Sequence, residues 1–217
     1  MENKENKSNS KQILLSVLGV AILVVAVVGI SFAAFTYSKA GETVNTISTG
    51  TITMSYDEAT NGIDIENAVP TADADGMVLS ADNEKFDFTV TAKITGSTTI
   101  NYEVVAVKAN DAEADSSTLV PDANIRLYLE SSTDGTSYSQ VFAPAAFTGI
   151  TTADDFGAPV GSMVLANSSF TTADGSNSGI EQKVYYRLRM WVDETYVVSG
   201  VAQSYKVKVN VYGKGTN

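Results

Sequence analysis

Hydrophobic and polar residues alternate along much of the chain, which is the pattern of strands with one buried and one exposed face. In the segment 84–95 the positions expected to face inward are Phe86, Phe88, Val90, Ala92 and Ile94. The same period of two predicts further strands over residues 46–57, 99–108, 125–129, 138–142, 182–193 and 204–212. All four prolines fall between these segments, where a missing backbone donor does not interrupt a sheet. The pattern therefore predicts an all-β fold, a two-sheet antiparallel β-sandwich.

Two turns predict which of these strands are neighbours. The pair Asp134-Gly135 lies between two predicted strands and is a strong hairpin signal. The short run Thr95-Gly96-Ser97 joins the 84–95 strand to the 99–108 strand, so we expect these two strands to form a second hairpin.

The remaining segments are predicted as connections or as solvent-facing positions. No amphipathic helix of useful length is expected after residue 40, and the segments 59–83 and 148–179 are predicted as long connections with insertions or short helical turns. In the last strand, Lys206, Lys208 and Asn210 are expected on the solvent side, where lysines protect a sheet from unwanted pairing.

The amino-terminal segment has the pattern of a secretory signal. Basic residues among polar ones precede an almost wholly aliphatic run from Ile13 to Ile30, and small residues follow at the positions that a signal peptidase reads. We predict cleavage between Ala33 and Ala34. The alternative is an uncleaved membrane anchor, because the aliphatic run exceeds the roughly 7–15 residues of a signal and approaches the roughly 20 that span a bilayer.

Both alternatives place the rest of the chain outside the cytoplasm, because basic residues before a hydrophobic segment favour the cytoplasmic side. We therefore predict a secreted protein, extracellular or at the cell surface, that meets the membrane only through its amino-terminal segment. The predicted layout is a signal helix or anchor over residues 1–33, an extended tail over 34–45 and a single β-sandwich domain over 46–217.

Composition excludes most catalytic chemistry. The chain has no histidine and no cysteine, so imidazole-based and thiol-based catalysis and the usual zinc sites are excluded. Paired carboxylates that hydrolyse glycosides remain, but no pair can be chosen from the sequence. The formal net charge of −11 disfavours nucleic acid as a partner. We expect a protein that is not an enzyme.

One acidic segment has part of the pattern of a calcium-binding loop. Its candidate ligands, at the first, third, tenth and twelfth positions, are Asp73, Asp75, Asp82 and Glu84. Met77 stands where an oxygen ligand belongs, and Val78 stands where the turn glycine belongs. We therefore expect a solvated loop, with a weak calcium site as the alternative, and no other cofactor.

A second feature with two interpretations is the stripe Arg187, Arg189 and Trp191 on one strand. Arginine and tryptophan dominate interface anchors, so the stripe is a candidate partner surface. The alternative, which we favour, is that Trp191 packs beneath a loop with the arginine stems covering it.

The boundary between the hydrophobic segment and the sandwich resembles the start of the TasA/camelysin family. The resemblance lies in Ala33-Ala34-Phe35, Asn45-Thr46 and the strand opening Gly50-Thr51-Ile52-Thr53-Met54, and it covers about residues 13–58. Members usually carry Ser-Asp or Asn-Asp after the phenylalanine, where this chain has Thr36-Tyr37.

The resemblance implies a jelly-roll sandwich, export through a SipW-type signal peptidase and, for one branch, assembly into extracellular fibres of a biofilm matrix. Another branch is described as a metalloprotease, but a chain without histidine lacks the ordinary ligands of a catalytic zinc.

These observations lead to two hypotheses of different class. In the first, the chain is a structural subunit that assembles head-to-tail with copies of itself, because the new amino terminus adds a strand to the next subunit. The residues of this donor strand are Ala34, Phe35, Thr36, Tyr37 and Ser38. In the second, an uncleaved anchor holds a cell-surface binding or adhesion module, and the loops of the sandwich bind the ligand.

Overall fold

The computed structural model describes residues 36–40, 45–49, 52–59, 63, 68–95, 98–109, 118–172, 179–198, 200 and 202–216. All of them belong to one compact unit, Thr36–Asn217. The predicted signal segment, the predicted cut and the first two donor-strand residues, Ala34 and Phe35, lie outside the described residues. Among the helices of the described part, none has the length and apolar character needed to cross a membrane.

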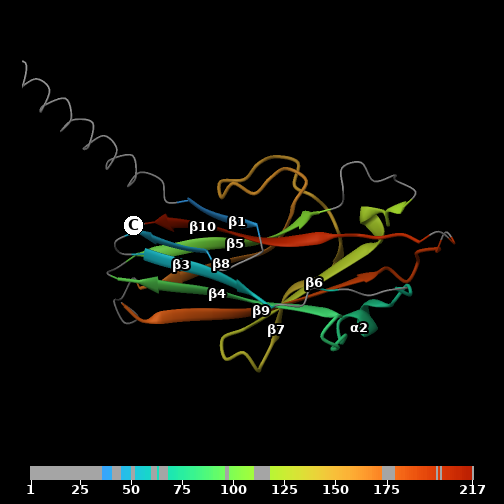
Figure 1. The fold of residues 1–217 in the computed structure, drawn as a ribbon, viewed down its shortest axis with the longest axis horizontal. Coiled ribbons are helices and arrows are strands. Elements are labelled where there is room, and N and C mark those ends of the chain that lie inside the picture. Colours follow the sequence, from blue (N-terminus) through green and yellow to red (C-terminus); the bar gives the residue numbers. More distant parts are fainter. Residues whose placement is uncertain are drawn as a thin grey trace, which may run out of the picture. The chain divides into compact units, whose positions relative to one another are not determined.

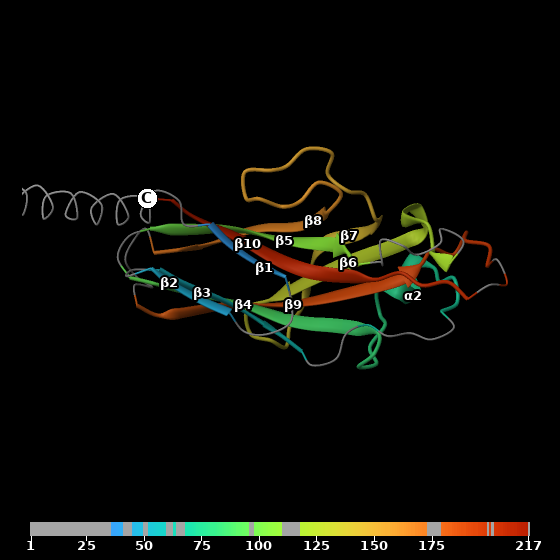
Figure 2. The same ribbon diagram turned by 45° about the horizontal axis from the view of Figure 1, so that its top comes forward.

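The described residues form two antiparallel sheets packed as a sandwich, which confirms the predicted fold class (Figures 1 and 2). The four-stranded sheet has the order β1 (Thr36–Ala40), β10 (Val207–Thr216), β5 (Thr99–Lys108) and β8 (Met163–Thr171). The six-stranded sheet has the order β2 (Asn45–Thr49), β3 (Ile52–Glu58), β4 (Lys85–Ile94), β9 (Glu181–Val192), β6 (Ile125–Ser132) and β7 (Ser139–Ala146). The helical turns described are α2 (Asp73–Gly76) and η2 (Asp122–Asn124).

One of the two predicted hairpins is correct. The strands β6 and β7 on either side of Asp134-Gly135 pair as an antiparallel hairpin, with Leu129 opposite Phe142. Gly135 adopts a φ of 74°, which L-amino acids with a side chain rarely adopt. In addition, the Asp134 carboxylate accepts hydrogen bonds from the backbone N–H groups of Thr136 and Ser137, both at 2.8 Å, and so stabilises the turn.

The second predicted hairpin is wrong, because the chain changes sheets between β4 and β5. β4 pairs with β3 and β9 in the six-stranded sheet, whereas β5 pairs with β10 and β8 in the four-stranded sheet. Each strand turns its apolar face to the interior, so the two faces oppose each other across the core. Alternation identifies which face of a strand is buried but not which strand it pairs with, so the pattern alone does not predict the pairing.

Another difference is β8, which lies inside the segment predicted as a long connection. Met163, Leu165, Ala166 and Phe170 of this strand are buried. The run Met163-Val164-Leu165-Ala166 is continuously apolar and therefore does not alternate. The connection before β8 covers its second face. A strand covered on both faces need not alternate, so the period of two did not predict β8.

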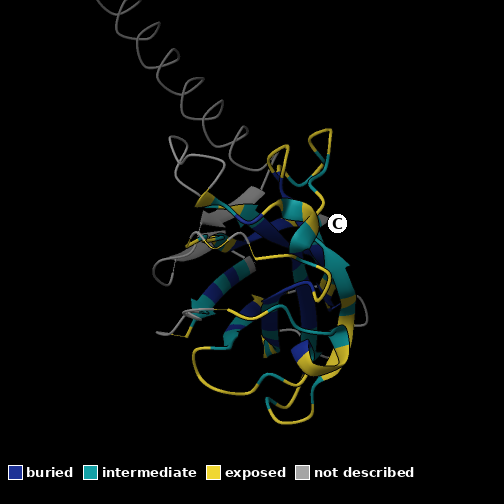
Figure 3. Ribbon diagram, turned by 90° about the vertical axis from the view of Figure 1, so that its right-hand side faces the viewer, coloured by how far each residue is buried: buried dark blue, intermediate teal, exposed yellow. Residues whose placement is uncertain are grey.

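The core between the sheets includes most of the residues predicted to face inward on β4. Phe88, Val90, Ala92 and Ile94 are buried, whereas Phe86 is half-buried. Buried residues also fill most of the interior in Figure 3. The rings of Phe88 and Tyr186 stack with centroids 5.1 Å apart within the six-stranded sheet. The hydroxyls of Tyr102 and Tyr186 are 2.8 Å apart and join the two sheets through a hydrogen bond. This bond satisfies two polar groups that burial would otherwise penalise.

The outer face of the four-stranded sheet is also buried, under the connection between β7 and β8. This connection, residues 147–162, rises above β5 and β8 in Figure 2. It places Ala158 against Val105 and Tyr212 in a second apolar cluster. Asn210, which was predicted on the solvent side, is buried on this face and donates a hydrogen bond to the Tyr212 hydroxyl at 2.9 Å. That prediction was wrong because a covering loop leaves no alternation signal in the strand beneath it.

Candidate functional site

The strand β1 at the edge of the four-stranded sheet contains Thr36, Tyr37 and Ser38, three of the predicted donor-strand residues. It pairs antiparallel with β10 over five residues, from Thr36 opposite Lys214 to Ala40 opposite Asn210. In a single chain, therefore, this segment completes the sheet of its own domain.

The edge that β1 covers has the properties of a strand-acceptor site. β10 spans ten residues, Val207–Thr216, and pairs along that whole length with β5 on its other side. β1 covers only the part of β10 from Asn210 to Lys214. An edge strand whose N–H and C=O groups are free on one side is a template for pairing with another chain, so removal of β1 would expose such a template.

The far edge of the six-stranded sheet differs from this acceptor edge. Its last strand, β7, contains Pro144, and its pairing with β6 is interrupted by register shifts around Leu127 and Leu129. Proline and irregular pairing both protect an edge from strand addition.

A pocket lies at the end of the sandwich where β9 ends and β10 begins. Its volume is about 480 Å³, and its lining includes Met190, Trp191, Gln203, Tyr205 and Lys206. Trp191 is 4% exposed, and its indole N–H has no hydrogen-bond partner. A buried donor without an acceptor is costly, so this end of the sandwich offers a hydrogen bond that nothing in the described part of the chain accepts.

The position of Trp191 settles the two interpretations of the arginine stripe. A Cβ atom at Gly76 of α2 would lie 2.3 Å from atoms of the indole ring, so α2 packs directly on Trp191. Arg187 forms an ion pair with Asp87 at 2.7 Å, and Arg189 forms one with Glu130 at 2.5 Å. Trp191 is thus buried beneath a loop, as we favoured, and both arginines are occupied within the domain.

The acidic segment proposed as a weak calcium site is not gathered around a common point. Glu84 accepts hydrogen bonds from the backbone N–H groups of Ser80 at 3.1 Å and Ala81 at 2.9 Å. Asp82 lies 3.9 Å from Lys85, and the Asp73 carboxylate lies 3.7 Å from Arg126. Asp75 falls in the single helical turn of α2. Within the described residues no three acidic side chains are grouped to bind a metal, so the segment is a loop that caps itself.

Comparison with known proteins finds similar solved structures but no matching family. No protein-family model and no curated protein matches the chain. Among solved structures, one match is the carbohydrate-binding module TmCBM61 in complex with β-1,4-galactotriose, at 6% identity and a TM-score of 0.23, over 83% of this chain and 87% of that one. Another is the glycoside hydrolase domain of Endo-D from Streptococcus pneumoniae R6, at 11% identity and a TM-score of 0.17, over 84% of this chain and 21% of that one.

Proposed function

We propose that the chain is a secreted structural subunit that assembles into an extracellular fibre or matrix by exchange of β1. The observation that carries the proposal is the position of β1. It is the first strand after the hydrophobic segment, only five residues long, and it fills the open edge of β10. Cleavage after Ala33 by a SipW-type peptidase would free this strand at the amino terminus.

Exchange requires little net free energy, because β1 of one copy can adopt on a neighbour the same register that it has on its own domain. Each backbone hydrogen bond lost within one chain is replaced by an identical one between chains. Donor strand and acceptor edge are different surfaces, so the contact is head-to-tail and can extend into a filament. The resemblance to the TasA/camelysin family also favours this function.

A proline in the middle of the donor strand tests the proposal. We expect filaments of the 34–217 chain in electron micrographs, and we expect Ser38→Pro to abolish them, since proline fixes φ and removes a backbone donor. The matched control, Ser38→Ala, keeps the backbone donor and should still form filaments. Globular particles from the unmodified chain would contradict the proposal.

A second candidate function, the anchored surface-binding module, has an observation of its own in the pocket beside Trp191. The chain has a single tryptophan, so its fluorescence reports on this pocket alone. We would titrate soluble oligosaccharides and short peptides and follow the emission. A saturable change that Lys206→Ala weakens supports the binding module, and unchanged emission throughout the panel would contradict it.

A further inference from the structure

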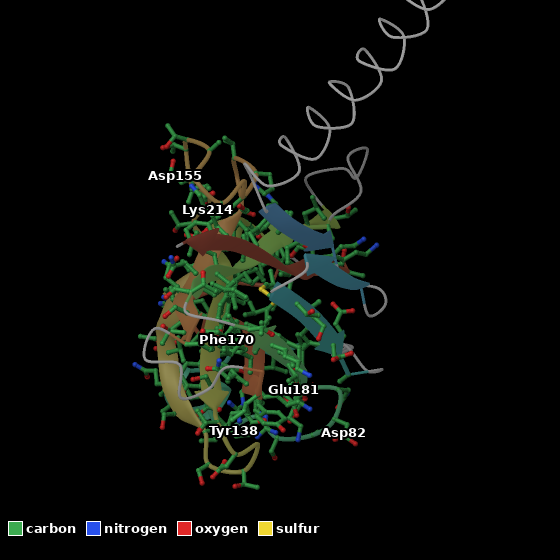
Figure 4. The ribbon with its side chains drawn as sticks, turned by 90° about the vertical axis from the view of Figure 1, so that its left-hand side faces the viewer. Asp82, Tyr138, Asp155, Phe170, Glu181 and Lys214 are labelled. Carbon is green, nitrogen blue, oxygen red and sulfur yellow. The ribbon has the colours of Figure 1, made fainter. Side chains whose placement is uncertain are left out.

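A pair of carboxyl groups lies on the outer face of the four-stranded sheet, away from both β1 and the Trp191 pocket. Glu103 belongs to β5 and stands opposite Asn167 of β8 and Tyr212 of β10. The Glu103 residue is 6% exposed, which is unusual for a glutamate. Asp154 belongs to the covering loop, next to Asp155, which Figure 4 labels.

The loop backbone fixes the orientation of Asp154. One oxygen, Oδ1, accepts hydrogen bonds from the N–H groups of Phe156 at 2.9 Å, Gly157 at 2.8 Å and Ala158 at 3.0 Å. Three donors to a single oxygen leave the second oxygen, Oδ2, for another partner. Burial alone would raise the pKa of Asp154, but the contact with Glu103 and these three backbone bonds together lower it.

The two remaining oxygens lack a donor among the described residues. Glu103 Oε2 and Asp154 Oδ2 are both buried, and neither has a hydrogen-bond partner in that part of the chain. The two carboxyl groups lie close enough for each to shift the pKa of the other. Burial, followed by the contact with Asp154, raises the pKa of Glu103 to about 7. Two neighbouring carboxylates repel each other when both are ionised.

No cation of the protein neutralises the pair in the part of the chain that the structure describes. The ion pairs there involve other carboxylates, and the lysines and arginines that form them belong to other clusters. Burying an unpaired charge costs several kcal/mol, so a compensating positive charge is expected from outside the chain.

The surroundings of the pair supply oxygen ligands. An open pocket of about 450 Å³ is lined by Glu103, Asp154, Asn167 and the loop residues 149–153, which include the hydroxyls of Thr151 and Thr152. Carboxylate, amide, hydroxyl and backbone carbonyl oxygens are the ligands of hard divalent cations, and Ca²⁺ accepts them in irregular arrangements. Mg²⁺ demands a stricter octahedron, and the softer metals prefer imidazole and thiolate ligands, which this chain lacks because it has no histidine and no cysteine.

We propose that Glu103 and Asp154, together with Asn167, bind a Ca²⁺ ion that fastens the 147–162 loop to the sheet. The site is separate from the acidic segment 73–84. The two unpartnered carboxylate oxygens become ligands of the ion.

Calorimetry and thermal unfolding of the full chain test the site. After treatment with a chelator, we expect CaCl₂ at pH 8 to bind with saturation at one site. At about 100 times the Kd, the ion should raise Tm by about 5 °C.

Two variants separate the site from the general acidity of the surface. Glu103→Gln keeps the shape of the side chain but removes its charge, so the variant should fold and should lose calcium binding at least tenfold. Asp155→Asn removes an exposed neighbouring charge and should bind calcium as the unmodified chain does. Absence of binding at millimolar calcium, or equal binding by Glu103→Gln, would overturn the proposal.

Discussion

The two sheets of the sandwich differ in how they are completed. The six-stranded sheet is completed by its own residues, since Arg187 pairs with Asp87, Arg189 pairs with Glu130, and proline and irregular pairing protect the β7 edge. The four-stranded sheet depends on two additions, the short strand β1 at one edge and the 147–162 loop on its outer face. Both proposals, strand exchange and ion binding, therefore concern the four-stranded sheet.

The largest loss of stability is expected in the six-stranded sheet. Arg189→Ala should lower the free energy of unfolding by about 3 kcal/mol, because it leaves the largely buried Glu130 carboxylate with only the Tyr128 hydroxyl as a partner. Arg187→Ala is the control, since its ion pair with Asp87 is more exposed and should contribute about 1 kcal/mol or less. Urea unfolding measures both. Equal losses of unfolding free energy in the two variants would contradict the expectation that the more buried ion pair contributes more to stability.

A smaller loss of stability is expected where α2 covers the outer face of the six-stranded sheet. Gly76→Ala places a methyl group against the Trp191 ring and should cost about 1–3 kcal/mol through overpacking. Trp191→Phe in the same chain should recover part of the loss, because the smaller ring leaves room for the methyl group. Thermal unfolding of the two single variants and the double variant measures the coupling, and strictly additive losses would contradict the contact.

A third effect is a pH dependence confined to the four-stranded sheet. Because the pKa of Glu103 is raised from 4.5 to about 7 in the folded chain, its stabilising contribution is complete below pH 4.5 and declines as the pH rises through 7. In a chelating buffer, the difference in Tm between the unmodified chain and Glu103→Gln should change over this interval. A constant difference from pH 4 to pH 8 would contradict the raised pKa of Glu103.

Alternation in the sequence predicted most of the strands and their buried faces, but not how they divide between sheets. β4 and β9 alternate cleanly because one face of each meets the core. The continuous run Val104-Val105-Ala106-Val107 in β5 signals burial on both faces, and it could have indicated the covering loop. The pairing of β4 with β9 rather than β5 depends on contacts between distant segments, which local patterns do not encode.

The candidate sites show the same limit. The segment containing Thr36, Tyr37 and Ser38 was predicted as an extended strand, but its pairing with its own β10 required the fold. Glu103 and Asp154 are 51 positions apart and share no motif, whereas the acidic segment 73–84 has part of a motif without the geometry. A motif with fixed spacing identifies a site only when one continuous segment supplies all of its residues. A site built from a strand and a distant loop has no such motif.

Cysteine pairing between two differently labelled chains tests the exchange of β1 most directly, because the natural chain has no cysteine. Thr36 lies directly opposite Lys214 in the β1–β10 register, so a Thr36→Cys chain mixed with a Lys214→Cys chain under oxidising conditions should form a disulfide between chains. The control mixture, Ser38→Cys with Lys214→Cys, is two residues out of register and should form much less. Abundant linkage in the first mixture alone is the predicted result. Equal linkage in both mixtures, or chains that remain unlinked, would contradict strand exchange.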